Sequence, residues 1–141
     1  MPREDLDRKH MDEILLKAQD GALGIGGALG TVDNEGNPYV VPIGFKYAQG
    51  AIYLFCDYIG EKVINIRGNP SICLIVTHKE PGRTSSVILR GKAEEFKDEA
   101  IVRKVWGENA LKLMRKHSPR GVYFKIKPEK ISGKSYFRAT V

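Results

Sequence analysis

The residues that most often build metal, disulfide or nucleophilic sites are scarce in this sequence. It has two cysteines, Cys56 and Cys73, and three histidines. The cysteines lie in separate apolar runs without Cys-x-x-Cys spacing, so we expect free thiols rather than a disulfide framework or a zinc site. His10, His78 and His117 are far apart, and none stands beside a second metal-type ligand at a recognisable spacing. We therefore predict no metal site.

Long apolar runs and a strong excess of one charge are also absent. No run approaches the ~20 residues of a membrane span, and the polar N-terminus carries no visible secretory signal. We therefore predict a cytoplasmic protein that does not enter membranes. The 23 basic residues are scattered among 17 acidic ones, which disfavours nucleic-acid binding. With 42% hydrophobic and 28% charged residues, we expect a single globular domain over residues 1–141.

Familiar catalytic motifs are missing as well. The sequence has no Gly-x-Ser-x-Gly, no His-Glu-x-x-His and no Walker loop. Gly24, Gly26 and Gly30 suggest a dinucleotide fingerprint, but a helical pattern precedes them, a turn follows, and Lys46 stands about where the acidic residue should be. If the protein is an enzyme, we expect a bound cofactor to carry the chemistry, and no catalytic side chain can be named.

Hydrophobic periodicity supplies most of the structural prediction. We expect helices over residues 7–20, 60–67 and 98–117, and strands over residues 22–32, 39–47, 51–56, 71–77, 85–96 and 122–131, with a turn at 33–38 and a polar loop at 78–84. Antiparallel hairpins dominate this order, and no βαβ alternation runs through it. The fold class is therefore mainly β, a six-stranded, mostly antiparallel closed or split barrel with flanking α-helices.

Two residues inside the predicted strands have a positional meaning. Pro42 cannot donate to a sheet ladder, so an edge, a bulge or a mouth is expected there. Gly91 falls in the middle of a long strand, which suggests a bulge or a barrel corner. The glycines of residues 22–32 mark either the close approach of a ligand or a tight bend.

The stretch from Tyr53 to Pro70 is the best candidate for a ligand site. A strand runs through Gly60 into a short helix, and a helix N-terminus presents free backbone N–H groups and a positive dipole end. Lys62 in the first turn could join those amides around a phosphate. The alternative is that Gly60 is only a turn and Lys62 a solvated lysine.

Three motifs give the chain a resemblance to a known family. They are Gly-Asn-Pro-Tyr-Val-Val-Pro-Ile (36–43), the Ile-Tyr-Leu…Gly-Glu-Lys…Asn-Ile-Arg-Gly-Asn-Pro block (52–70) and Ser-Ser-Val-Ile-Leu-Arg-Gly-Lys-Ala (85–93). In this order and spacing they resemble the FMN-binding split β-barrels related to pyridoxamine 5'-phosphate oxidase, particularly the nitroimidazole-resistance-like group.

The resemblance implies a homodimer with FMN in each of two clefts between subunits. Lys62 would contact the phosphate next to Gly60, the backbone of Val41, Pro42, Ile43 and Gly44 would lie along the isoalloxazine, and Phe55, Cys56 and Asp57 would line the ribityl and phosphate end. Ser85, Ser86 and Arg90 would complete the site, some of them from the partner chain.

The same resemblance implies an FMN-dependent oxidoreductase that moves hydride or electrons between a reduced nicotinamide nucleotide and a small-molecule acceptor. The alternative is a non-catalytic protein of the same fold that holds flavin, haem or a deazaflavin. Phe55 stands where the nitroimidazole-resistance group has a histidine linked to its nitroreductase chemistry, which counts against nitroimidazole reduction. Asp57 brings a negative charge near the expected phosphate, unless it caps the helix instead.

Overall fold

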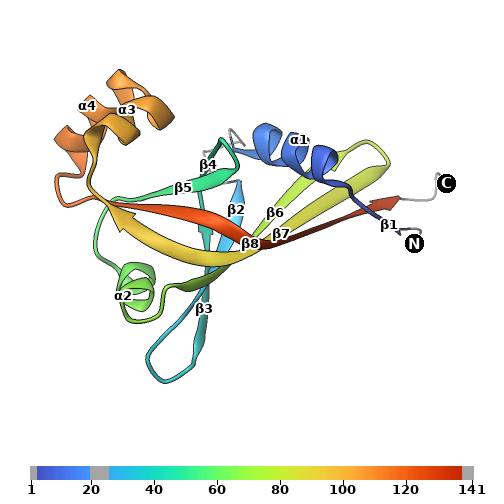
Figure 1. The fold of residues 1–141 in the computed structure, drawn as a ribbon, viewed down its shortest axis with the longest axis horizontal. Helices are drawn as coiled ribbons and strands as arrows, with labels where there is room; N and C mark the ends of the chain where they lie inside the picture. Colours follow the sequence, from blue (N-terminus) through green and yellow to red (C-terminus); the bar gives the residue numbers. More distant parts are fainter. Residues whose placement is uncertain (1–2, 20–25, 138–141) are drawn as a thin grey trace.

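One curled antiparallel sheet of eight strands organises the molecule (Figure 1). The computed structural model describes residues 3–19 and 26–137. In chain order the elements are β1 (Arg3–Asp5), α1 (Arg8–Ala18), β2 (Gly27–Val32), β3 (Pro38–Ile43), β4 (Lys46–Ala48), β5 (Ala51–Cys56), α2 (Glu61–Gly68), β6 (Ser71–Glu80), β7 (Arg83–Phe96), α3 (Glu99–Trp106), α4 (Glu108–His117) and β8 (Val122–Phe137). The strand order is β3-β2-β6-β7-β8-β5-β4, and β1 pairs with β8.

The predicted fold class is confirmed, because the architecture is a mainly β, antiparallel split barrel with helices around it. The predicted count of six strands is wrong. The strand expected over 39–47 is two strands, β3 and β4, separated at Gly44 and Phe45. This break carries the chain from one end of the strand order to the other. The short β1 was not expected, since three exposed charged residues leave no hydrophobic pattern.

The β2–β3 hairpin forms at the predicted turn. The Asp33 carboxylate accepts hydrogen bonds from the amides of Glu35 and Asn37, at 2.9 and 2.8 Å, and so closes the turn. Pro42 lies in β3, at the end of the strand order, so the expected edge position is confirmed. The structure has β2 from Gly27 to Val32, while residues 22–25 of the expected strand lie outside the described residues.

The longest strands of the sheet are β6, β7 and β8. Residues 78–84, expected as a loop, instead extend β6 and β7 to a tight turn where Gly82 has a φ of +74°. β8 likewise continues past residue 131 to Phe137. The bulge predicted at Gly91 is confirmed, since the β7–β8 register shifts between Arg90 and Gly91. A Cβ on Gly91 would lie 2.6 Å from the Lys127 carbonyl oxygen, so the two backbones approach closely.

The expected long helix over 98–117 is two helices. Gly107 has a φ of +96°, a left-handed conformation that glycine adopts readily and that ends α3 before α4 begins. The apolar stripe continues across the break, which is why periodicity alone joined the two helices. In Figure 1 this helical pair stands beside the end of the barrel where β5, β7 and β8 meet.

The main hydrophobic core lies inside the curl of the sheet. α1 closes it with four buried side chains, and the Asp7 carboxylate caps this helix by accepting from the His10 amide. The largest fully buried side chains of this core are Leu15, Leu29, Ile52, Leu54, Leu74, Leu89, Phe124 and Ile126. No helix within residues 3–19 and 26–137 is both long and apolar enough to cross a membrane.

Candidate functional site

The ligand site predicted around Gly60 and Lys62 lies at the junction between β5 and α2, and residues 60–62 at this junction are called the corner below. Gly60 is the N-cap residue of α2, in an extended conformation, and no side chain caps the helix there. The first-turn amides of Glu61 and Lys62 therefore have no side-chain acceptor. An uncapped first turn is a favourable place for an anion, because its N–H groups point outward at the positive end of the helix dipole.

Four side chains lie around this corner: Cys56, Asp57, Tyr58 and Lys62. Lys62 is half-buried, and its Nζ lies 5.7 Å from the centroid of the exposed Tyr58 ring. Burial raises the pKa of the Cys56 thiol to about 11, while Lys62 lowers this pKa and Asp57 raises it. The charges of Lys62 and Asp57 are thus both close enough to Cys56 to change the pKa of its buried thiol. Asp57 does not cap α2, so its exposed carboxylate is free to oppose an anion at this corner.

α2 is held in place by two polar contacts with the sheet. Asn65 donates a 3.1 Å hydrogen bond from Nδ2 to Oγ1 of Thr31 on β2, and both residues are buried. Arg67 donates two hydrogen bonds to the Glu95 carboxylate of β7, at 2.9 and 3.1 Å. These contacts fix the orientation of the helix start. Sequence analysis missed Asn65, whose burial inside a polar stretch has no signal in the periodicity.

β3 presents a free strand edge in the region predicted to hold a ring. Because β3 ends the strand order, the backbone of Val41, Pro42 and Ile43 has one side without a partner strand among the residues that the structure describes. Ile43 points into the core, while Pro42 is exposed. An unpaired edge offers backbone donors and acceptors next to a flat surface.

The structure separates the three predicted residues of β7 from β3. Two strands, β2 and β6, lie between β3 and β7 in the sheet. Ser85 faces the core, where its hydroxyl lies 2.7 Å from that of Ser135. Ser86 and Arg90 lie on the opposite, outward face. Within one chain, therefore, these residues are not assembled with the corner at Gly60.

Phe55 also has a different surrounding from the other predicted residues. Its ring packs on Tyr123, with centroids 5.2 Å apart, and lies against Gly121, where a Cβ would be 2.4 Å from Phe55 Cε2. The ring is thus directed at β8, so only the Phe55 backbone remains available to the corner. Phe55 belongs to an aromatic cluster outside the main core, made of Tyr53, Phe55, Phe96, Trp106 and Tyr123.

None of the three histidines belongs to the β5–α2 junction. His10 contacts Asp7, with Nδ1 2.6 Å from the carboxylate, and His78 contacts Glu80 at 3.1 Å. His117 lies in the last turn of α4. Among residues 3–19 and 26–137, no cluster of three or more His, Cys, Asp or Glu side chains could hold a metal ion.

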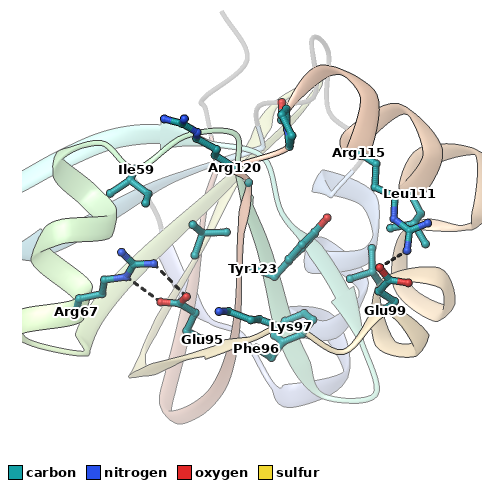
Figure 2. A pocket seen from close by; sticks show the side chains of 15 residues that line it. Ile59, Arg67, Glu95, Phe96, Lys97, Glu99, Leu111, Arg115, Arg120 and Tyr123 are labelled. Carbon is teal, nitrogen blue, oxygen red and sulfur yellow. Dashed lines mark hydrogen bonds and ion pairs between the residues drawn. The ribbon is translucent and has the colours of Figure 1, made fainter.

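A cavity of about 500 Å³ lies beside the corner but shares none of its predicted residues. Its walls come from α2, the end of β7, the α3–α4 pair and the start of β8 (Figure 2). Sequence analysis missed this cavity because its lining comes from five separate segments.

Comparison with known proteins gives a consistent result. A family model for pyridoxamine 5'-phosphate oxidase matches residues 26–135. No curated protein sequence matches the chain. Among solved structures, an FAD-binding protein from Mesorhizobium loti is 24% identical with a TM-score of 0.78, covering 96% of this chain and 99% of that one.

Two further structures have the same fold. A candidate 5-nitroimidazole antibiotic resistance protein from Bacteroides thetaiotaomicron is 23% identical, with a TM-score of 0.71, covering 96% of this chain and 89% of that one. The haem storage protein of Vibrio cholerae is 17% identical, with a TM-score of 0.67, covering 88% and 92% of the two chains. At these identities the likeness extends to the fold alone.

Proposed function

The chain belongs to the pyridoxamine 5'-phosphate oxidase family, and on this premise we propose that it is an FMN-binding flavoprotein. The observation that carries the proposal is the uncapped first turn of α2 beside Lys62. This corner would suit the phosphate of FMN, because the uncapped amides and the Lys62 side chain belong to the same first turn of α2. The similarity to an FAD-binding protein supports a flavin as the ligand class.

The flavin ring would lie along the edge of β3. The backbone of residues 41–44 would supply donors and acceptors for the ring, and the backbone of residues 55–57 would line the ribityl chain. Asp57 opposes the phosphate, so it would lower the affinity rather than raise it. Lys62 would compensate for this charge as well as contact the ligand.

A second copy of the chain would complete the site. On the outward sheet face, Val40 is 65% exposed and Ile75 is 37% exposed. The register places Val40 opposite Gly30 and Ile75 opposite Ala28, so small and apolar residues adjoin on this face. Such an exposed apolar patch favours self-association. Ser86 and Arg90 belong to the same face, and in a dimer they could approach the partner's corner.

The proposed activity is transfer of hydride or electrons from a reduced nicotinamide nucleotide to a small-molecule acceptor. FMN supplies the redox chemistry when bound. The chain's own groups bind the phosphate, orient the ring and cover it. Asp57 and Lys62 are the charged side chains of the corner, and no role as acid or base in the transfer is assigned to either.

The function is tested on the purified protein. We expect flavin absorbance corresponding to one FMN per chain, which reduced nicotinamide bleaches and air or an added acceptor restores. Bound flavin that stays oxidised would contradict the oxidoreductase proposal and favour a flavin carrier. The Vibrio cholerae structure makes haem a specific alternative, and a Soret band after incubation with haemin would support it.

The dimer is tested by the mass in solution. Light scattering should give twice the 15.8 kDa of the chain. Val40→Asp should shift this value toward the monomer and weaken FMN binding, because a charge would be buried in the interface. Lys112→Asp on the exposed surface of α4 is the matched control. A monomeric wild-type protein that binds FMN fully would contradict the shared site.

A further inference from the structure

The cavity beside α2 has the size of a small-molecule site. Its volume of about 500 Å³ falls within the ~300–1,000 Å³ of typical ligand pockets. Its lining contains none of the twelve residues predicted for the flavin. The cavity borders the predicted flavin residues, since Ile59 on its wall directly precedes Gly60, but it is lined by other side chains, and these indicate what it could hold.

One part of the wall is apolar and aromatic. Phe96 and Tyr123 line the cavity with ring centroids 5.7 Å apart, and the buried side chains of Val102 and Leu111 lie beside them. Aromatic side chains of this kind bind planar apolar ligands by stacking and edge contacts. Figure 2 shows the Tyr123 ring in the middle of the cavity, with Ile59 on one side and Leu111 on the other.

The rest of the wall is rich in cations, and two of them are already paired. Arg67 binds Glu95, and Arg115 binds Glu99. In Figure 2 the two ion pairs lie on opposite sides of the cavity. Each pair neutralises its own charge and fixes a guanidinium at the rim.

Lys97 and Arg120 also line the cavity, and within residues 3–19 and 26–137 neither makes an ion pair. With four basic and two acidic side chains, the lining carries a net positive charge. An anionic group at the rim would therefore be attracted, and a neutral one would not.

We propose that this cavity binds a small aromatic anion, a planar apolar ring that carries a carboxylate or a phosphate monoester. The ring lies against Tyr123 and Phe96, and the anionic group lies at the rim, either at the Arg120 edge or at the Lys97 edge, which Figure 2 shows on opposite sides. Burial raises the pKa of the Tyr123 hydroxyl, so this group stays neutral at ordinary pH and does not repel the anion.

The test uses isothermal titration calorimetry on the FMN-saturated protein. The probes are 2-naphthoate, 2-naphthyl phosphate and the uncharged 2-naphthamide. We expect at least one of the two anions to bind with a Kd below about 1 mM, and the amide to bind about tenfold more weakly. The anion that binds more tightly identifies the natural anionic group.

Variants locate the bound probe. Lys97→Gln combined with Arg120→Gln should weaken the anion about tenfold and leave FMN affinity unchanged, because neither residue is among those proposed to hold FMN. Lys112→Gln, on α4 outside the cavity, should change neither affinity.

Three results would overturn the proposal. They are no detectable binding at about 1 mM, equal binding of the amide and the anions, or anion affinity unchanged in the double variant. Loss of anion binding in Lys62→Ala with retention in the double variant would place the probe at the flavin corner and refute the cavity as its site.

Discussion

The hydrogen bond between Asn65 and Thr31 should anchor the helix that presents the proposed phosphate site. Asn65 is 5% exposed and Thr31 is 2% exposed, and their side chains are joined at 3.1 Å. Asn65→Ala removes the donor and leaves the buried threonine hydroxyl without its partner. A buried polar group left unsatisfied costs about 1–3 kcal/mol.

A loss of about 2 kcal/mol should lower the melting temperature by roughly 6–8 °C for a chain of this size. The assay is urea unfolding followed by circular dichroism at a fixed protein concentration, since association would shift apparent stability. Thr31→Val provides the second arm of a double-mutant cycle, because it keeps the side-chain shape and removes the hydroxyl.

The cycle should give a coupling energy of about 0.5–1.5 kcal/mol between Asn65 and Thr31. FMN should also bind Asn65→Ala more weakly than the wild type, because the start of α2 is less well fixed. A coupling energy below about 0.3 kcal/mol, within the error of additivity, would refute the role of this hydrogen bond in docking α2.

Three other properties can be predicted from single residues. In native protein at pH 8, iodoacetamide should leave Cys56 unmodified until denaturant is added, because burial raises its thiol pKa to about 11; mass spectrometry locates any label. Arg67 lowers the pKa of the Glu95 carboxylate, so this ion pair stabilises the fold above the ordinary glutamate pKa of about 4.3 and is lost as pH falls through the lower folded value. On acidification, the free energy of unfolding of Glu95→Gln should therefore fall by up to about 1 kcal/mol less than that of the wild type. Identical pH dependences of the two proteins would contradict this role of the ion pair. Gly121→Ala should destabilise the fold by about 1–3 kcal/mol in thermal unfolding, because its methyl would overlap the Phe55 ring; an unchanged melting temperature would show that the ring relaxes freely.

Much of the fold could be predicted from local patterns. The strand at 51–56 was predicted from its apolar and aromatic composition and the helix after Gly60 from the spacing of Ile59, Val63 and Ile66, and both form where expected. Pro42 and Gly91 identified an edge and a bulge, because each residue has a backbone restriction that few positions in a sheet tolerate.

The parts that could not be predicted depend on long-range contacts. The lining of the cavity comes from segments between residues 59 and 123, and no local pattern brings them together. The break at Gly107 was hidden because the apolar stripe continues across it. Ser85 was assigned to the ligand by resemblance, although its alternation with Val87 and Leu89 already indicated the core side of β7. The assignment of site residues and the cytoplasmic location stay predictions.

FMN and riboflavin titrations of the wild type and Lys62→Ala test the phosphate corner most directly. The two ligands differ only in the phosphate, so the wild type should prefer FMN, and Lys62→Ala should lose about tenfold in FMN affinity while riboflavin affinity changes little. Asp57→Asn should bind FMN more tightly, and Lys104→Ala, on the exposed surface of α3, serves as the charge-matched control. Equal FMN affinities for Lys62→Ala and the control, or a wild type that binds riboflavin as tightly as FMN, would contradict a phosphate site at the start of α2.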